Sequence, residues 1–388
     1  MIGKTGYDVI ITGGGPTGAT AGYLLSKAGL RVLIIDKSTF PRKKLCAGLI
    51  TLKTVRLLER VFGESVDSLK EKGLINYESN SYEIYCRDRL VAGRTIDVPF
   101  RFIDRESYDY FLLNKARNAG AEIREGDGIG IRSIDVLKST VSTMSGKKFS
   151  ADIIIGADGV NSRVRRNFLV DLFGREDWSG NVAAAHEIFL DRDSVNKKID
   201  HPMLFFGFTE YGYAWVFPNR KRLKIGMCGL KKKNKGDILS AFRTFLSDMR
   251  LCGTGEEKIH SYVLPYGSFL PEPVFRNVML AGDAAGFADP LLGEGIYYAQ
   301  RSAELAAQAI IERRDAMRHA PALYLELLQK YIYPELIYAG KISRVLFSYL
   351  SRLHYLPLKV LMHALGDMPV ETVHGIRSYK WMRKLAEK

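Results

Sequence analysis

The chain is poor in cysteine, and it lacks both an excess of acidic residues and any long apolar run. Its four cysteines, Cys46, Cys86, Cys228 and Cys252, have spacings that match neither a zinc site nor a disulfide framework. No stretch approaches the roughly 18 to 20 uninterrupted apolar residues of a membrane-spanning helix. The first residues already have the pattern of a strand, so we expect no signal peptide. Together these absences predict a cytoplasmic protein without a metal site.

Basic residues are in excess, because 57 lysines and arginines oppose 43 aspartates and glutamates and leave a net charge of +14. A basic balance is typical of proteins that bind nucleic acid, but no nucleic-acid motif or stacking platform accompanies the charge here. We therefore expect no nucleic-acid partner. An anionic membrane surface or a phosphorylated substrate suits the charge better. A basic surface that serves only solubility is an equally simple interpretation.

A glycine-rich turn near the N-terminus separates a predicted strand from a predicted helix. Residues 8–12 and 31–36 form apolar runs typical of strands, and residues 19–28 have a helical pattern between them. The turn at residues 13–18 matches the G-x-G-x-x-G spacing of a dinucleotide-binding βαβ unit. In that context dinucleotide binding is a better interpretation than a plain structural turn.

Dinucleotide binding gives a physical reason for each residue type in this turn. Gly13 makes the tight turn, Gly15 admits a pyrophosphate, and Gly18 lets the helix pack closely on the strand. Pro16 suits the first helical turn, where its missing N–H costs nothing. Asp36, about 20 residues further on, is placed to accept a hydrogen bond from the adenosine ribose.

A second glycine-rich segment lies at residues 281–299. It follows an apolar run at residues 278–281, which predicts a strand, and it opens a helix. Asp283 offers a carboxylate to hydroxyl groups, and the glycines let a ligand approach the backbone. A helix N-terminus adds free N–H groups and a partial positive charge. The segment is therefore a second place where a buried polar ligand can be held.

The predicted elements alternate between two interwoven lobes, which indicates an α/β fold class with an α+β second lobe. Residues 151–158 have the pattern of a buried strand, and residues 105–118 and 237–249 have helical patterns. The expected parts are a discontinuous Rossmann-like dinucleotide-binding domain over residues 1–75, 101–180 and 271–320, an antiparallel-sheet substrate domain over 76–100 and 181–270, and a helical C-terminal segment over 321–388.

Three segments, taken in order, resemble the FAD-dependent oxidoreductases of the para-hydroxybenzoate hydroxylase superfamily. They are residues 13–18, residues 156–165 with the sequence GADGVNSRVR, and residues 282–295. The resemblance extends over roughly residues 7 to 315. It implies a Rossmann-like FAD-binding domain and FAD as the cofactor.

Two further motifs narrow the resemblance to the geranylgeranyl reductase family. Residues 40–48, FPRKKLCAG, are similar to the family's cysteine-containing loop, and residues 211–218, YGYAWVFP, are similar to its Tyr-x-Trp-x-Phe-Pro signature. The resemblance implies that Cys46 lies beside the flavin ring and that Tyr213 and Trp215 line the isoprenoid pocket. These three are the catalytic candidates. The residues alone leave other interpretations open, since a free cysteine is usually a small buried hydrophobe and large aromatics are common in strand cores.

The resemblance also implies a set of cofactor-binding residues. Asp283 would bind the ribityl chain, and Arg105 would lie near the ribityl and phosphate region. Backbone N–H groups at Gly293, Gly295 and Ile296 would meet the flavin pyrimidine edge, where reduced flavin is negatively charged. Some charged members of the set, such as those in the cysteine-containing loop, are equally interpreted as a solvated loop. The full set is Gly13, Gly15, Pro16, Thr17, Gly18, Asp36, Lys37, Arg42, Lys44, Cys46, Ala47, Gly48, Arg105, Asp158, Gly159, Gly282, Asp283, Gly293, Gly295 and Ile296.

The activity implied by the resemblance is FAD-dependent reduction of C=C bonds in a polyprenyl chain of geranylgeranyl type. The chain would be part of a lipid, a quinone or a prenyl diphosphate. No second G-x-G-x-x-G turn follows a predicted strand, so the electron donor is either NAD(P)H bound without its own domain or ferredoxin.

Two alternatives to a reductase are open. A flavin-dependent monooxygenase or halogenase of the same superfamily is the first, because halogenases carry a related Trp-x-Trp-x-Ile-Pro signature. Tyr213 and Phe217 depart from that signature towards the reductases. The second is a non-catalytic prenyl-lipid carrier, against which the complete set of flavin-binding residues argues.

The C-terminal segment is rich in both apolar and basic residues. Two interpretations of this segment are equally good: an ordinary pair of packing helices, and an amphipathic surface that lies on a membrane. On the second interpretation the protein is peripheral on the inner face of a membrane, with Lys380, Arg383 and Lys384 facing anionic lipid.

Overall fold

The computed structural model describes residues 6–172, 178–195, 198–251, 257–353 and 355–382. The chain forms two compact units, and each is built from three separated segments. Unit 1 has a parallel sheet covered by helices, and unit 2 has a mainly antiparallel sheet, so the predicted fold class is confirmed. Unit 1 contains residues 1–44, 106–177 and 268–337, and unit 2 contains residues 45–105, 178–267 and 338–388.

The sheet of unit 1 has the strand order β15-β16-β9-β1-β2-β6, and the β7–β8 hairpin joins it through β9. Neighbouring strands from β16 to β6 run parallel, whereas β15 is antiparallel to β16. Strand β1 and the second half of β9 are apolar runs, because a parallel strand covered on both faces has no solvated side. The strands are β1 (Tyr7–Thr12), β2 (Val32–Asp36), β6 (Glu122–Glu125), β7 (Ile131–Asp135), β8 (Thr140–Thr143), β9 (Lys148–Gly156), β15 (Val274–Phe275) and β16 (Val278–Leu280).

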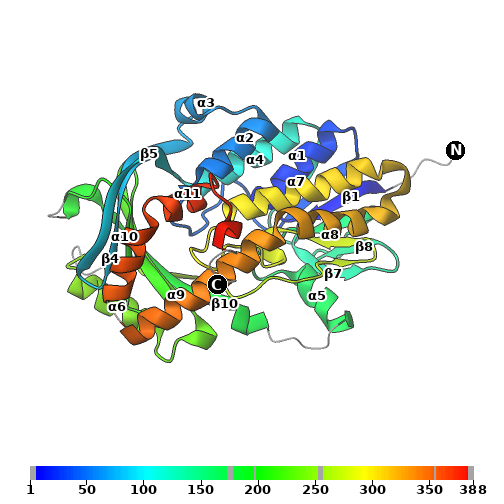
Figure 1. Cartoon of the computed structure of the whole chain (residues 1–388). Helices are drawn as coiled ribbons and strands as arrows, with labels where there is room; N and C mark the ends of the chain where they lie inside the picture. The colour runs from blue at the N-terminus through cyan, green and yellow to red at the C-terminus, as the bar shows by residue number, and fades with distance from the viewer. Residues whose placement is uncertain (1–5, 173–177, 196–197, 252–256, 354, 383–388) are drawn as a thin grey trace. The chain divides into compact units, whose positions relative to one another are not determined.

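Helices α1 and α7 of unit 1 lie side by side, and α8 packs next to α7 (Figure 1). Gln300 of α7 ties this layer together, since it accepts from the Tyr108 hydroxyl at 2.9 Å and donates to Thr20 at 3.5 Å. Helix α4 has the predicted bounds, and Pro16 is in the first turn of α1, as predicted. The helices are α1 (Pro16–Lys27), α4 (Arg105–Asn118), α5 (Arg163–Leu172), α7 (Ile296–Glu312) and α8 (Ala320–Tyr331), with short 3-10 helices η4 (Gly282–Ala284) and η5 (Arg314–His319).

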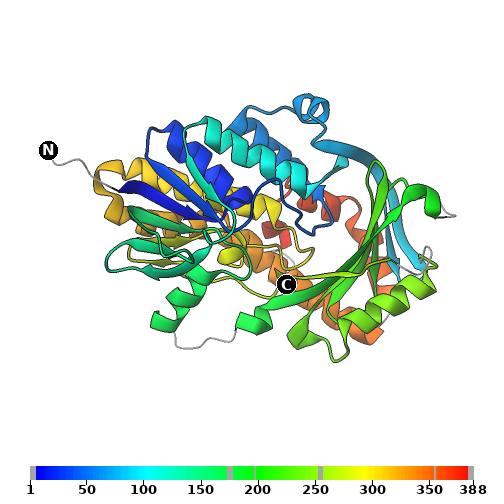
Figure 2. The same cartoon turned by 180° about the vertical axis from the view of Figure 1, so that it is seen from behind.

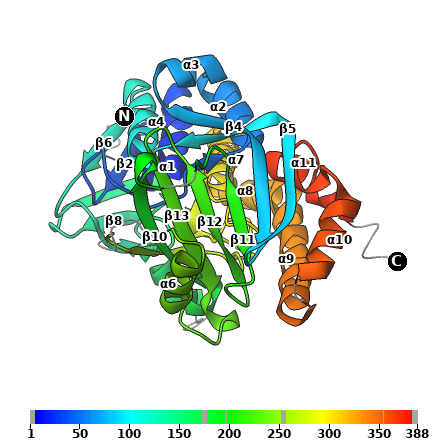
Figure 3. The same ribbon diagram turned by 90° about the vertical axis from the view of Figure 1, so that its left-hand side faces the viewer.

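The sheet of unit 2 has the order β14-β10-β13-β12-β11-β4-β5-β3, and most of these strands can be followed side by side in Figure 3. Adjacent strands are antiparallel except for the parallel pair β11–β4. The strands are β3 (Leu49–Ile50), β4 (Ile75–Cys86), β5 (Arg89–Ile103), β10 (Val182–Asp191), β11 (Met203–Phe206), β12 (Gly212–Pro218), β13 (Arg222–Leu230) and β14 (His260–Pro265).

The two faces of this sheet differ because successive residues of a strand point to opposite sides. Helix α6 (Ile238–Asp248), close to its predicted bounds, lies along one face (Figure 2 and Figure 3). There Phe205 and Met227 of the sheet pack in one buried cluster with Phe242 and Phe245 of the helix. The alternate residues of the same strands form the other face.

The C-terminal segment is helical, as predicted. Helix α9 (Tyr333–Leu353) begins in unit 1 and continues in unit 2, and it is followed in unit 2 by α10 (Tyr355–Leu365), α11 (Met368–His374) and the 3-10 helix η6 (Tyr379–Met382). Arg383 and Lys384 lie outside the described residues. In the ranges that the structure describes, no helix is both long and apolar enough to cross a membrane, and no group of acidic, histidine and cysteine side chains is arranged as a metal site.

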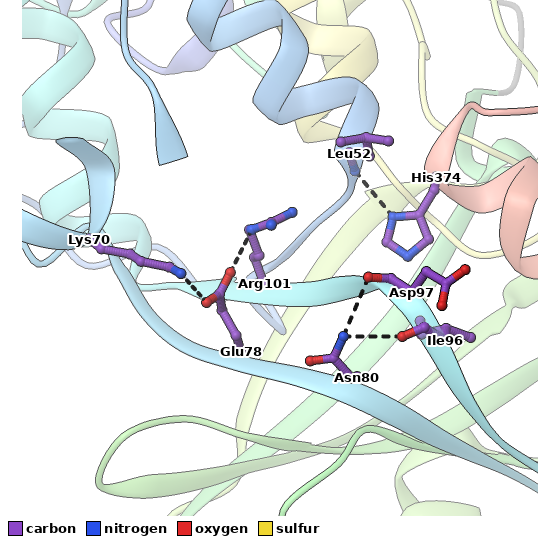
Figure 4. A network of polar contacts seen from close by, with 8 residues as sticks. All are labelled: Leu52, Lys70, Glu78, Asn80, Ile96, Asp97, Arg101 and His374. Carbon is purple, nitrogen blue, oxygen red and sulfur yellow. Dashed lines mark hydrogen bonds and ion pairs between the residues drawn. The ribbon is translucent and has the colours of Figure 1, made fainter. Parts of the chain in front are cut away.

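Residues 45–75 group with unit 2, although their sequence pattern predicts that they belong to the dinucleotide-binding domain. The reason is local pairing and packing: β3 pairs with β5, and the backbone N–H of Leu52, at the start of α2 (Leu52–Phe62), donates to His374 Nδ1 at 3.2 Å (Figure 4). Helix α3 (Val66–Glu71) adds a second link, since its Lys70 forms an ion pair with Glu78 of β4, which also accepts from Arg101 at 2.7 Å. Which unit binds cofactor and which binds substrate stays a prediction.

Candidate functional site

In the turn before α1, Gly13 and Gly18 are required by the packing of the protein, whereas Gly15 is not. Gly13 has φ +105°, and a Cβ there would lie 2.3 Å from the Ala157 carbonyl oxygen, while a Cβ at Gly18 would lie 1.8 Å from the Gly13 oxygen. The packing of the protein itself requires these two. Gly15 has an ordinary φ of −71°, and a Cβ there would meet the far end of the Arg42 side chain at 3.4 Å. The space in front of Gly15, at an N-terminus of α1 without a side-chain cap, fits a pyrophosphate.

Asp36 closes this turn from the end of β2. Its Oδ2 accepts the Gly14 N–H at 2.7 Å and its Oδ1 accepts the Ser38 N–H at 2.8 Å. Each carboxylate oxygen has a further lone pair, so Asp36 can still accept a ribose hydroxyl. Lys37, the next residue, is exposed.

Arg42 and Lys44, two of the basic residues in the loop after β2, lie against acidic partners in unit 1. The Arg42 guanidinium stacks over the Phe40 ring at 4.7 Å and forms an ion pair with the fully buried Asp109 at 3.4 Å. Lys44 Nζ lies 3.8 Å from Asp283 Oδ2. Arg42 is therefore held next to the Gly15 turn, which argues against a freely solvated side chain at this position.

Asp158 of the second fingerprint segment caps α5. Its carboxylate accepts the Ser162 hydroxyl at 2.5 Å and the backbone N–H groups of Arg163 and Val164 at 2.6 and 3.3 Å. Burial raises the pKa of Asp158, and these hydrogen bonds act in the opposite direction. Gly159 follows in the left-handed region, with φ +79°.

Arg165, also in this segment, links it to the Asp283 turn. The side chain is buried, and it donates to the Ala284 carbonyl at 2.9 Å and to the Val160 carbonyl. Burial lowers the pKa of Arg165 to about 10. Sequence patterns assigned no role to this residue, because a guanidinium that binds carbonyls far along the chain leaves no local signature.

The Asp283 segment is packed against the first turn. Gly282 has φ +59°, and a Cβ there would lie 2.3 Å from the Thr17 hydroxyl oxygen. Gly293 also has a positive φ, +68°. Gly295 is the N-cap of α7, which has no side-chain cap, and a Cβ at this glycine would lie 3.3 Å from Asp283 Oδ1.

These contacts bring the three fingerprint segments together within unit 1. The open space before Gly15, the carboxylates of Asp36 and Asp283, and the N-termini of α1 and α7 are the groups that an FAD molecule needs. The residues present therefore fit FAD. Most of the predicted cofactor set lies in unit 1, and the members in unit 2 are Cys46, Ala47, Gly48 and Arg105.

In unit 2, the predicted aromatic residues form a row on the sheet face opposite α6. Tyr213 and Trp215 of β12 are both buried, and their ring centroids are 5.9 Å apart. The row continues from Tyr213 to Phe206 at 6.0 Å and from Trp215 to Phe217 at 6.4 Å. The row is therefore buried and apolar, and its role as an isoprenoid pocket stays a prediction.

The Cys46 loop lies in the same unit. The thiol sulfur accepts the Gly48 N–H at 3.3 Å, and Cys46 is partly exposed rather than buried in a core. Gly48 has φ +81°, and a Cβ there would lie 2.3 Å from the Ile103 oxygen and 2.7 Å from Lys224 Nζ. Arg105, at the start of α4, is buried.

Glu187 is a potential functional residue that the sequence analysis missed. It lies on β10, its side chain is fully buried, and neither carboxylate oxygen has a hydrogen bond of normal geometry among the described residues. Burial raises the pKa of Glu187 to about 7, although the Lys224 charge, the Trp215 indole and the Cys46 backbone amide lower it in part. A single acid in an apolar strand has no signature in the sequence, so only the strand register could reveal it.

Comparison with known proteins agrees with this geometry. Residues 6–237 match the FAD binding domain family. An uncharacterized protein of Methanosarcina barkeri is 33% identical over 315 residues, which cover 80% of this chain and 76% of that one. A geranylgeranyl diphosphate reductase of Rhodobacter capsulatus is 31% identical over 319 residues, covering 78% and 74%.

The fold is also similar to that of a solved structure, a geranylgeranyl bacteriochlorophyll reductase-like protein of Thermoplasma acidophilum. The TM-score is 0.74 at 21% identity, with 92% of this chain and 90% of that chain covered. At this identity the likeness supports the fold alone. Sequence similarity carries the family assignment: the chain belongs to the geranylgeranyl reductase family of FAD-dependent oxidoreductases.

Proposed function

We propose that this flavoprotein saturates C=C bonds in a polyprenyl chain of geranylgeranyl type. The observation that carries the proposal is the buried aromatic row of Tyr213, Trp215 and Phe217 on the same sheet as a buried acid, Glu187. An apolar row can bind an isoprenoid, and its depth excludes water. The Rhodobacter capsulatus relative, a geranylgeranyl diphosphate reductase by name, supports the same substrate class.

In this proposal unit 1 binds the FAD. Gly15 and Arg42 would face the pyrophosphate, Asp36 would bind the adenosine ribose, and Asp283 would bind the ribityl chain. The backbone N–H groups of Gly293, Gly295 and Ile296 would meet the pyrimidine edge. The remaining members of the predicted cofactor set keep their predicted roles. When bound and reduced, FAD supplies a hydride. In unit 2, Tyr213 and Trp215 orient the prenyl chain, and the Cys46 loop lies beside the reacting double bond.

The proposal also covers the head group of the substrate and the electron donor for the flavin. The net charge of +14 favours an anionic head group, as in a prenyl diphosphate or a phospholipid, and a prenylated quinone is the third candidate. The donor is NAD(P)H or ferredoxin, because no second dinucleotide fingerprint is present in the sequence.

We also propose that helices α9 and α10 touch an anionic membrane surface. Val345, Leu356 and Val360 are 56%, 66% and 61% exposed, and Arg344 and Lys359 are exposed beside them in the sequence. We call these five residues the α9–α10 patch. Exposed apolar side chains flanked by basic ones are typical of interfacial helices. A membrane contact would shorten the path of a water-insoluble prenyl chain into the protein.

The product of the reaction tests the proposed activity. Purified protein should show a flavin absorbance spectrum, and with a chemical reductant and geranylgeranyl diphosphate under nitrogen it should yield product with two extra hydrogens per double bond by mass spectrometry. In parallel reactions with air, with and without added halide, a product that gains oxygen or a halogen would instead assign the monooxygenase or halogenase chemistry. Protein without flavin, or flavin-loaded protein that binds the chain unchanged, would leave the carrier alternative.

A further inference from the structure

Glu187, Gly226 and Trp215 lie in one row across three neighbouring strands. Glu187 of β10 pairs in register with Gly226 of β13, and Gly226 pairs with Trp215 of β12. A Cβ at Gly226 would lie 2.2 Å from Trp215 Cζ2. The indole therefore lies over the glycine and extends across β13 towards Glu187, and the acid belongs to the same sheet face as the aromatic row.

The full burial of Glu187 is unusual for a carboxyl group. The side chain is fully buried, and neither of its carboxylate oxygens nor Trp215 Nε1 has a hydrogen bond of normal geometry among the described residues. A buried carboxyl without hydrogen bonds of normal geometry destabilises the fold and is favoured in its neutral form. Such a residue is a strong candidate for a role in the chemistry of the site.

His260 of β14 pairs in register with Glu187, and Tyr262, Cys228 and Lys224 are the other titratable groups near it on β13 and β14. Burial raises the pKa of Tyr262 on β14 well above 10 and that of Cys228 on β13 to about 12, so both hold their protons tightly. Lys224 on β13 is an ammonium paired with Asp104 at 2.9 Å. The pKa of Glu187 itself is about 7, and an acid works best when its pKa is near the working pH. Cys46 contributes a backbone N–H that faces the carboxylate.

We propose that Glu187 is the acid that delivers the proton when a double bond is saturated. The inference rests on the proposed function. Saturating one C=C bond breaks the π bond and forms two C–H bonds. One carbon takes the hydride that reduced flavin supplies, and the other takes the proton from the Glu187 carboxyl, which is left as carboxylate.

The charged neighbours of Glu187 give the carboxylate a way to be reprotonated. Lys224 stabilises the carboxylate by its charge, and it donates to the Ile103 carbonyl at 3.0 Å and to Asp104. The Asp104 side chain is 52% exposed. In this proposal, Glu187 is reprotonated from solvent on the side of Lys224 and Asp104.

The experiment compares the wild-type protein with Glu187→Gln, a neutral isostere of the protonated acid, and with Glu83→Gln, a carboxylate elsewhere on the same sheet. Infrared titration of the flavin-loaded protein without substrate should show a protonated carboxyl band that disappears as pH rises through about 7. The band should be absent in Glu187→Gln and unchanged in Glu83→Gln. Flavin content should be equal in all three proteins.

Turnover under nitrogen with pre-reduced protein and geranylgeranyl diphosphate gives the second measurement. Glu187→Gln should lower the rate by about 10² to 10⁴, the range for loss of a general acid, and should remove the fall in rate above neutral pH. Glu187→Asp should restore the carboxyl band and part of the rate. In heavy water, the carbon that takes the proton should carry deuterium in the wild-type product.

The outcomes separate this inference from the proposed function. A wild-type protein that saturates the chain while Glu187→Gln does so at the same rate and with the same pH profile overturns only the inference. A missing carboxyl band in the wild-type protein overturns it as well. If wild-type protein with bound, reduced flavin gives no saturated product, the proposed function fails, and the role of Glu187 as its acid fails with it.

Discussion

The indole of Trp215 occupies the space that a side chain at Gly226 would need. The separation of 2.2 Å between a Cβ at position 226 and Trp215 Cζ2 is far below any normal contact. The same Cβ would lie 2.9 Å from the His186 carbonyl oxygen, which is backbone and cannot move aside easily. The glycine therefore fixes the indole flat against the sheet, next to Glu187.

Gly226→Ala should displace the indole and destabilise unit 2. The expected cost is about 1 to 3 kcal/mol, as for other overpacked core positions, measured by urea unfolding. Gly93→Ala is a matched control on the same sheet, since a Cβ there would approach no atom closer than 3.5 Å. Equal stability of Gly226→Ala and the wild-type protein would mean that the indole does not lie over the glycine.

Gly15→Ala should weaken FAD binding without weakening the fold. The new methyl group would enter the space proposed for the pyrophosphate, whereas its protein neighbour is the flexible end of Arg42 at 3.4 Å. The unfolding free energy of the flavin-free protein should change by less than about 0.5 kcal/mol, while retained flavin falls. Gly18→Ala is the contrasting variant, because a Cβ 1.8 Å from the Gly13 oxygen should destabilise the flavin-free protein too. Full flavin content in Gly15→Ala would contradict the proposed pyrophosphate position.

Glu187 should make the fold less stable as pH rises. Its pKa is about 7 in the folded protein and 4.5 as the ordinary value. Between these values the folded state holds a proton that the unfolded state has lost, so stability decreases with rising pH by about 3 kcal/mol in total. Unfolding free energies measured from pH 4.5 to 8 should lose this component in Glu187→Gln. An unchanged pH dependence would indicate that Glu187 is ionised in the fold at neutral pH.

His374 should make the fold less stable as pH falls, which is the opposite of the effect of Glu187. Burial, with the charges of Arg101 and Lys53, lowers its pKa to about 4 from 6.5, so the unfolded state binds a proton that the folded state does not. Stability should therefore fall as pH drops from about 6.5 to 4, again by about 3 kcal/mol. His374→Gln, which can still accept from the Leu52 N–H, should remove this acid sensitivity in the same unfolding series. Retained acid sensitivity in the variant would assign it to other groups.

The α9–α10 patch should bind anionic vesicles. Leu356→Ser with Val360→Ser removes apolar burial, and Lys359→Glu reverses a charge that is worth about 1 kcal/mol near an anionic surface. Vesicle flotation should show weaker binding in each variant and weaker binding of the wild-type protein at higher salt, with flavin content unchanged. Leu137→Ser is a control, because Leu137 is 75% exposed on unit 1, outside the patch. Equal recovery of wild-type protein on neutral and anionic vesicles would contradict a membrane role for the patch.

Local patterns predicted the regular elements well, because they depend on residues close in sequence. The βαβ unit at the N-terminus and the helix at residues 105–118 follow from apolar periodicity and from the glycine turn. The grouping of residues 45–75 with unit 2 could not be predicted from local patterns, because it depends on the pairing of β3 with β5, which are distant in sequence. Glu187 was missed for the same reason: its neighbours Cys46, Lys224 and Trp215 are distant in sequence, and strand register alone brings them together.

We expect Cys46 to contribute to turnover and not to the stability of the fold. The thiol is partly exposed and accepts the Gly48 N–H, so Cys46→Ala should keep flavin and change stability by less than about 1 kcal/mol. Prenyl reduction should fall strongly. A variant that reduces the chain at the wild-type rate would limit Cys46 to packing.

The most direct measurement of the central claim is a single turnover under nitrogen. Protein reduced to the dihydroflavin state and freed of excess reductant is mixed with geranylgeranyl diphosphate, and the flavin absorbance and the product mass are followed together. A reductase predicts that the oxidised flavin spectrum returns without oxygen and that one double bond is saturated for each flavin. A flavin that stays reduced until oxygen is admitted, with no saturated product, would contradict the account and indicate monooxygenase or halogenase chemistry.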